Sequence, residues 1–486
     1  MAFDIEKSIK YEYIFQNDVS INATEDYTLD VVLDEYAKLY PASNSYQQIA
    51  LDMYLELVRR QAALLETTVM GFITNVMSEI RLRYKDIRCE ERCTYSLEII
   101  FMIILLASCR GIVKSEDIVS FYRKHYPELF LLIPGIPKQE HKLSVSTINL
   151  AMTWISPEDV NDFFTAYFAQ IKHLITEQIT YNGNRYMFRD ENIKDTIGFD
   201  GQELKASNRK GNSNRQCKHH VVTLHNCTQN RVMNFHTAEA KNQEAAIALE
   251  HFFNIDLKDY VVMTDALNCK GKVSKAITKA GGLYLFRLKY NCNKDLTNHI
   301  DVVFDRNEQR SIKAQSIADR RHGRIDTYEY EILESTHLNS NFKHDFADIK
   351  TLVRVKKTSA KVIDSKIDKQ SYESKIYISS IPFNDLTMEQ VRASLEDYWG
   401  IEEHHSVLDK ETLFDQDNQT LSNANSVAVK VGYIKMGYSF LTDMRQKESI
   451  KQGRKKPISY DATMKAINES TIADQLFLMT EFMMPR

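Results

Sequence analysis

The chain has 486 residues, of which 43% are apolar and 26% charged, and its formal net charge is −4. This length suffices for two to four domains with full hydrophobic cores, and 15 Gly with 8 Pro are too few for a disordered chain. The balanced charge excludes a histone-like protein, yet residues 199–330 hold 21 Lys and Arg against 15 Asp and Glu. Such a basic middle segment favours local binding of phosphate groups.

The first 180 residues are predicted to be mostly helical. Residues 1–45 form an acidic arm, and 46–180 form an all-α region in which apolar residues recur at three- and four-residue steps. Residues 181–195 are polar and turn-rich, which is typical of a linker. The longest apolar run, Ile99–Ala107, is too short to span a bilayer. The clearest helices are predicted over Tyr95–Cys109, Ser115–His125, Ser144–Trp154 and Ser156–Leu174.

After the linker, short apolar runs predict an α/β core. Three strands, a helix, a strand, a helix and a strand are the order of an RNase H-like mixed sheet flanked by helices. We expect its first part over 195–289, a β-rich insertion over 290–387, and its second part with a helical tail over 388–486. The predicted elements are strands Thr196–Phe199, His220–Leu224, Val232–His236, Tyr260–Met263, Leu283–Leu288 and Asp326–Leu333, and helices Gln243–Phe253, Lys272–Ala280 and Met388–His405.

Three acidic residues are candidates for metal chemistry. Asp200 is expected at the end of one strand, with Gly198 leaving room beside it, and Asp265 at the end of another. Glu402 continues a helical stripe through Tyr398, so we expect it on the packed face with a positive partner. Three such carboxylates would bind two divalent cations. On spacing alone, strand-end Asp residues as turn formers and a solvated Glu remain the alternative.

The words around these acids resemble the DDE transposases of bacterial insertion sequences, in the branch that includes the H-repeat-associated proteins. The resemblance covers roughly residues 90–445, and five words in order carry it. These words are FDGQELK (199–205), TDAL (264–267), GGLYLFRLK (281–289), RHGRIDT (321–327) and WGIE (399–402).

The resemblance implies a catalytic and metal-binding triad of Asp200, Asp265 and Glu402, acting with two Mg²⁺ ions for which Mn²⁺ would substitute. The implied partner is double-stranded DNA, both element ends and target, bound by a homodimer whose helical N-terminal region recognises the ends. Scattered cysteines in odd number are typical of a reducing compartment, so we expect a cytoplasmic, nucleoid-associated protein without membrane contact. Glu403 and Glu396 depart from the family pattern, which affects the placement of DNA.

Basic residues in three places are candidates for phosphate contacts, with exposed solvated loops as the alternative. They are Lys205, Arg209, Lys210 and Arg215 after the first strand, Lys289 after the Leu283–Leu288 strand, and Arg321, His322 and Arg324 in the insertion.

Two other functions stay open at this level: a non-mobile metal-dependent nuclease of transposase origin, and a catalytically silent DNA-binding protein. A zinc site at Cys217, His219, His220, His225 and Cys227 is disfavoured because the spacing matches no standard finger. Trp399 is interpreted as a core anchor.

Overall fold

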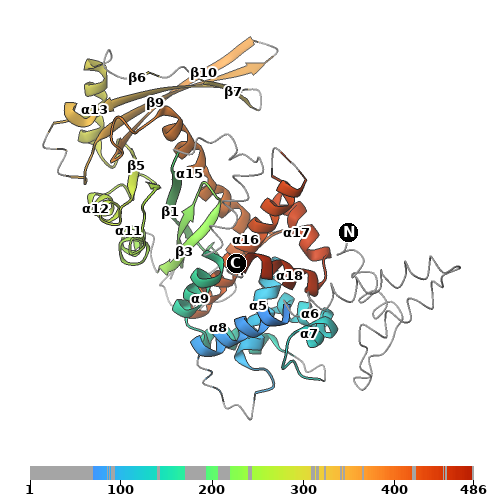
Figure 1. Cartoon of the computed structure of the whole chain (residues 1–486). Coiled ribbons are helices and arrows are strands. Elements are labelled where there is room, and N and C mark those ends of the chain that lie inside the picture. The colour runs from blue at the N-terminus through green and yellow to red at the C-terminus, as the bar shows by residue number, and fades with distance from the viewer. Residues whose placement is uncertain are drawn as a thin grey trace, which may run out of the picture. The chain divides into compact units, whose positions relative to one another are not determined.

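The computed structural model describes residues 69–84, 86, 88, 93–138, 143–169, 193–205, 219–238, 243–307, 312–313, 317–321, 324–339, 342, 345–363, 366–418, 423–452, 454 and 457–483. The acidic arm and the basic residues Arg209, Lys210, Arg215 and His322 lie outside these ranges. The chain divides into two compact units (Figure 1). The domain boundaries expected from the sequence stay predictions.

The first unit includes described segments on both sides of the second one in sequence, up to Leu106, over Ser115–Trp154 and from Ile467 onwards. Residues 69–83 are helical, and residues 99–110 are buried without a break, as expected for a helix in the middle of a core. The helix α7 was not predicted from the sequence. The helices of this unit are α5 (Leu97–Ser108), α6 (Ser115–Lys124), α7 (Tyr126–Leu132), α8 (Val145–Trp154) and α18 (Ile472–Met483).

The second unit is built on a mixed sheet of ten strands in the order β3-β2-β1-β4-β5-β10-β9-β8-β6, with β7 paired to β8. The strand β1 pairs antiparallel with β2 and parallel with β4. The strands are β1 (Asp195–Glu203), β2 (His220–Asn226), β3 (Arg231–Ala238), β4 (Tyr260–Thr264), β5 (Leu283–Leu288), β6 (Ile312–Lys313), β7 (Ile317–Arg321), β8 (Arg324–Glu334), β9 (Thr351–Ile363) and β10 (Lys366–Ser379).

Helices cover both faces of this sheet, which makes the unit an α/β structure. Ser156 caps α9 by accepting a hydrogen bond from the Asp159 amide. The strands of the predicted insertion continue the core sheet, because β10 pairs with β5. The helices are α9 (Pro157–Phe164), α11 (Glu244–Ile247), α12 (Gly271–Lys279), α13 (Lys294–Arg306), α15 (Met388–Asp409), α16 (Ala424–Lys451) and α17 (Tyr460–Glu469).

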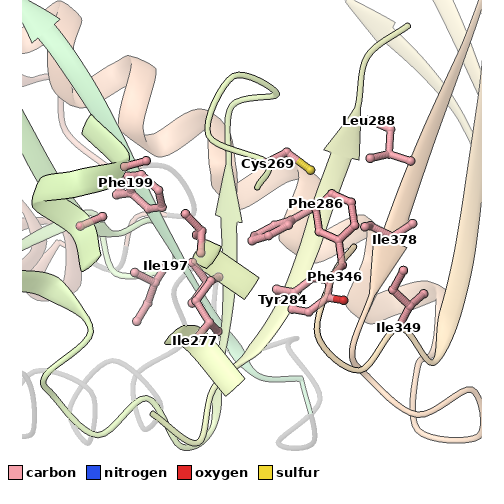
Figure 2. Packing of buried hydrophobic residues seen from close by; sticks show 14 of the residues in the cluster. Ile197, Phe199, Cys269, Ile277, Tyr284, Phe286, Leu288, Phe346, Ile349 and Ile378 are labelled. Atoms are coloured by element: carbon pink, nitrogen blue, oxygen red, sulfur yellow. The ribbon is translucent and has the colours of Figure 1, made fainter. Parts of the chain in front are cut away.

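Two hydrophobic cores lie on opposite faces of the sheet. One contains Val262 and packs under α12 and α13. Figure 2 shows two of its members on β1, Ile197 and Phe199. The other contains Val261 and Met263 and packs under α15. Because strand residues alternate between faces, this division tells which side each later residue of β1 and β4 faces. Across the part of the chain that the structure describes, we find no helix with the length and apolar character needed to cross a membrane.

Candidate active site

The two aspartates occupy neighbouring positions on neighbouring parallel strands. The last register pair between β1 and β4 joins Phe199 to Thr264, and Asp200 and Asp265 are the next residue on each strand. Adjacent strands lie about 4.8 Å apart, so the register brings the two carboxylate-bearing residues side by side. The sequence predicted Asp200 at the end of a strand, and this was wrong. Asp200 lies inside β1, because β1 stays paired with β2 as far as Glu203.

Both aspartates lie on the face of the sheet that α15 covers. Ile197 and Phe199 point into the core on the other face, so Asp200 points toward α15. Val261 and Met263 pack under α15, and Asp265 continues their alternation. The helix that carries Glu402 therefore runs over the face on which both aspartates lie.

Tyr398 connects the three acids electrostatically. Its ring lies on Gly198, where a Cβ would be 3.1 Å from Tyr398 Cε2. Burial raises the pKa of Tyr398 well above its ordinary value, and the carboxylates of Asp200, Asp265 and Glu402 each raise it further. Tyr398 is thus a neutral hydroxyl within electrostatic reach of the whole predicted triad.

Glu402 is exposed, which corrects the expectation that it packs against the protein. Its stripe is buried at Val391 and partly buried at Leu395 and Tyr398, but one turn later the side chain has passed beyond the packed surface. The expected positive partner is not found in the described part of the chain. A solvated carboxylate needs none, since water already stabilises the charge.

Backbone amides orient both aspartates. Asp200 Oδ1 accepts a hydrogen bond from the Gly201 amide at 2.9 Å. Asp265 Oδ1 accepts hydrogen bonds from the Leu267 and Asn268 amides, both at 3.0 Å. Each aspartate side chain is therefore oriented by backbone amides one to three residues further along the chain.

A histidine also faces Asp200: His405 Nδ1 lies 4.0 Å from Asp200 Oδ2. Burial lowers the pKa of His405 to about 3, with Lys435 contributing in the same direction. His405 is therefore neutral at physiological pH, and its contact with Asp200 is not an ion pair.

The donor set fits hard divalent cations, because carboxylate oxygen is what Mg²⁺ and Mn²⁺ prefer. No three His, Cys, Asp or Glu side chains among the described residues are close enough together to hold an ion as they stand. Closure on a metal would have to bring Glu402, which is exposed on its helix, toward the two aspartates.

The predicted phosphate-binding residues fall in three places. Lys205 is exposed and paired with Asp417. Lys289 follows β5, which is parallel to β4, so it lies at the same edge of the sheet as Asp265. Arg321 and Arg324 are register partners on β7 and β8, several strands away from the aspartates.

The sequence did not reveal two features of this region. Trp399 is 64% exposed, so its interpretation as a core anchor was wrong: the residue next to Tyr398 points about 100° away from the packed stripe. Glu244 is buried close to Gly201, and its sequence context gives no signal for this position.

Comparisons with known proteins support the resemblance. No family model matches the chain. It is 23% identical over 364 residues to "Putative protein YbfL" of Escherichia coli (strain K12), covering 74% of this chain and 88% of YbfL. It is 24% identical over 253 residues to "H repeat-associated putative transposase YhhI" of the same strain, covering 51% of this chain and 65% of YhhI.

A shorter match is to "H repeat-associated putative transposase YbfD", also of Escherichia coli (strain K12), at 28% identity over 142 residues, 29% of this chain and 55% of YbfD. These relatives confirm the resemblance to the H-repeat-associated branch. Among solved structures, a piggyBac transposase synaptic complex with hairpin DNA is 10% identical to this chain. The match covers 85% of this chain and 80% of the piggyBac chain. Its TM-score of 0.37 is too low to define the fold.

Proposed function

We propose that this protein is a DDE transposase that cleaves the ends of an insertion sequence and transfers the 3′ ends to target DNA. The observation that carries the proposal is the register of β1 and β4, which puts Asp200 beside Asp265 under the helix of Glu402. The strand order β3-β2-β1-β4-β5, with only β1, β4 and β5 parallel, supports an RNase H-like core. The transposase relatives support the reaction.

Asp200, Asp265 and Glu402 would hold two Mg²⁺ ions, or Mn²⁺ in their place. Bound metal would polarise the scissile phosphodiester and activate the attacking water or 3′-hydroxyl. The Gly201, Leu267 and Asn268 amides keep the aspartates oriented.

A row of basic residues supports binding to the DNA backbone. Register partners across four strands are Arg321 on β7, Arg324 on β8, Lys361 on β9 and Lys369 on β10. Positive residues gathered at register positions of neighbouring strands would attract the phosphate backbone of DNA. The basic row lies near the C-terminal end of β9 and the N-terminal end of β10. Along β10 it is about 25 Å from the residues that pair with β5. DNA bound both at the basic row and at the three acidic residues would span a long surface. Joining two DNA ends would need two copies of the chain.

Purified protein incubated with element-end DNA and Mg²⁺ tests this proposal. We expect Asp200→Asn, Asp265→Asn and Glu402→Gln each to reduce cleavage about 100-fold or more while end binding changes little, since the carboxylates supply metal charge. The exposed Glu411→Gln is the control. A triad variant that cuts as fast as the wild type would remove that residue from the site.

The same assay separates the alternatives when a pre-cut end and plasmid DNA are supplied. A transposase joins the end to the plasmid. Cutting without joining would identify a nuclease, and binding without either reaction would identify a silent DNA-binding protein.

A further inference from the structure

Glu244, the first residue of α11, is a buried carboxylate outside the predicted triad. Its side chain is 4% exposed. Burying a charged group costs free energy unless hydrogen bonds or ion pairs compensate for the lost water. The carboxylate lies against Gly201, where a Cβ would be 2.2 Å from Glu244 Oε1. Its other oxygen, Oε2, accepts a hydrogen bond from Asn268 Nδ2 at 2.6 Å.

Through these two contacts Glu244 reaches Gly201, which follows Asp200, and Asn268, which donates to Asp265. Gly201 follows Asp200 and, by the alternation of β1, faces the core of Ile197 and Phe199 rather than α15. Figure 2 shows Phe199 in this core. Glu244 therefore touches the backbone of β1 on the face opposite to that of Asp200.

Asn268 transmits the second contact. Its side-chain amide donates to Glu244, while its backbone amide donates to Asp265 Oδ1 at 3.0 Å. Asn268 is itself only 3% exposed, so water cannot easily replace either bond. One carboxylate thus links the residue after Asp200 to the residue whose amide orients Asp265.

We propose that Glu244 is a positioning residue that fixes the separation of Asp200 and Asp265. The inference rests on the proposed function, in which that separation sets how tightly the aspartates bind metal. It explains why residue 201 is glycine, since any side chain there would displace the carboxylate. It also requires the length of Glu at 244, because Asp is one methylene too short to reach Asn268.

The test uses the full-length protein with Glu244→Asp, with Asn268→Gln, and with both changes together, which restores the combined side-chain length. Glu250→Asp, an exposed acid six residues further along the same helical segment, is the control. Hydrogen–deuterium exchange of the Leu267 and Asn268 amides is measured without metal, and Mn²⁺ affinity is measured by calorimetry without DNA.

We expect Glu244→Asp to speed exchange at these two amides about tenfold and to weaken Mn²⁺ binding about tenfold, as for residues that orient ligands. The double variant should recover most of both losses. Unchanged exchange and affinity in Glu244→Asp would overturn the proposal, as would faster exchange throughout the sheet with no recovery in the double variant. Failure of the wild type to bind Mn²⁺ more tightly than Asp200→Asn would instead overturn the metal site, while the exchange measurement would still decide the role of Glu244.

Discussion

The ring of Tyr398 lies directly on the backbone of Gly198. A Cβ at Gly198 would be 3.1 Å from Tyr398 Cε2 and 3.0 Å from Cys227 Sγ, tighter than ordinary van der Waals contact. The sequence suggested that Gly198 leaves room beside the acid; the room is occupied by an aromatic ring of α15. The glycine therefore sets how closely the helix of Glu402 approaches the strand of Asp200.

Gly198→Ala should push α15 away from β1. Because overpacking a filled core costs about 1–3 kcal/mol, we expect a loss of that size in the free energy of unfolding and a loss of DNA cleavage of about tenfold or more. Urea titration and the cleavage assay measure the two effects. Gly71→Ala, at a helical glycine with no atom within contact of an added Cβ, is the control. Full activity in Gly198→Ala would mean that the approach of α15 does not matter.

Metal addition should stabilise the wild type more than a triad variant. A ligand that binds only the folded state raises stability by RT ln(1 + [L]/Kd), about 1–3 kcal/mol at tens of Kd. We expect Mn²⁺ to raise the melting temperature of the wild type relative to EDTA, and to raise that of Asp200→Asn much less. Glu411→Gln should respond like the wild type. Equal shifts in all three proteins would contradict the role of Asp200 as a ligand.

The burial of Lys435 predicts that the free energy of unfolding rises above neutral pH. Lys435 is fully buried in α16, where it donates to Thr223 Oγ1 at 3.0 Å and contacts His404 Nε2 at 2.8 Å. Burial lowers its pKa from 10.5 to about 7, although Asp409 opposes the shift. Between pH 7 and 10.5 the unfolded chain thus binds a proton that the folded chain does not, and the free energy of unfolding increases with pH.

We therefore expect the free energy of unfolding to rise by up to about 1.4 kcal/mol per pH unit from pH 7 to 9. Lys435→Met should be more stable than the wild type at pH 6, because it avoids burying a charge, and should show a flatter profile. Lys451→Met, at the exposed end of the same helix, is the control. Denaturant titrations at pH 6, 7, 8 and 9 decide this, and parallel profiles for wild type and Lys435→Met would contradict it.

The basic row on β7 to β10 predicts how strongly DNA affinity depends on salt. Each phosphate contact adds about 0.9 to the slope of log affinity against log salt for duplex DNA. Replacing both Arg321 and Arg324 with Ala should therefore reduce that slope by about 1.8, with cleavage of bound DNA little changed. Lys272→Ala with Lys275→Ala removes the same charge from exposed positions on α12. A slope that falls equally in both double variants would mean that the row has no special contact with DNA.

Local patterns predicted much of the core. The strands β1 to β5 and the helices α12 and α15 were expected within a few residues of their observed bounds. The helix α16 was not, although it has 28 residues, because it is buried on almost every side from Val427 to Asp443 and so has no polar face to produce a helical period. The helix α13 was also not predicted, because its β-branched residues are typical of strands. Its buried residues nevertheless follow helical spacing: Leu296, Ile300, Val303 and Phe304.

The sequence by itself determined that Asp200 and Asp265 each follow an apolar run of strand type and that Glu402 follows a packed helical stripe, because alternation and helical period are local properties of the chain. Tertiary structure decided that Phe199 pairs with Thr264, that Glu402 is exposed, and that Glu244 lies behind both aspartates. These relations depend on which strands pair and in which register. That choice is made by packing between segments tens of residues apart, and it leaves no periodic signal in either segment.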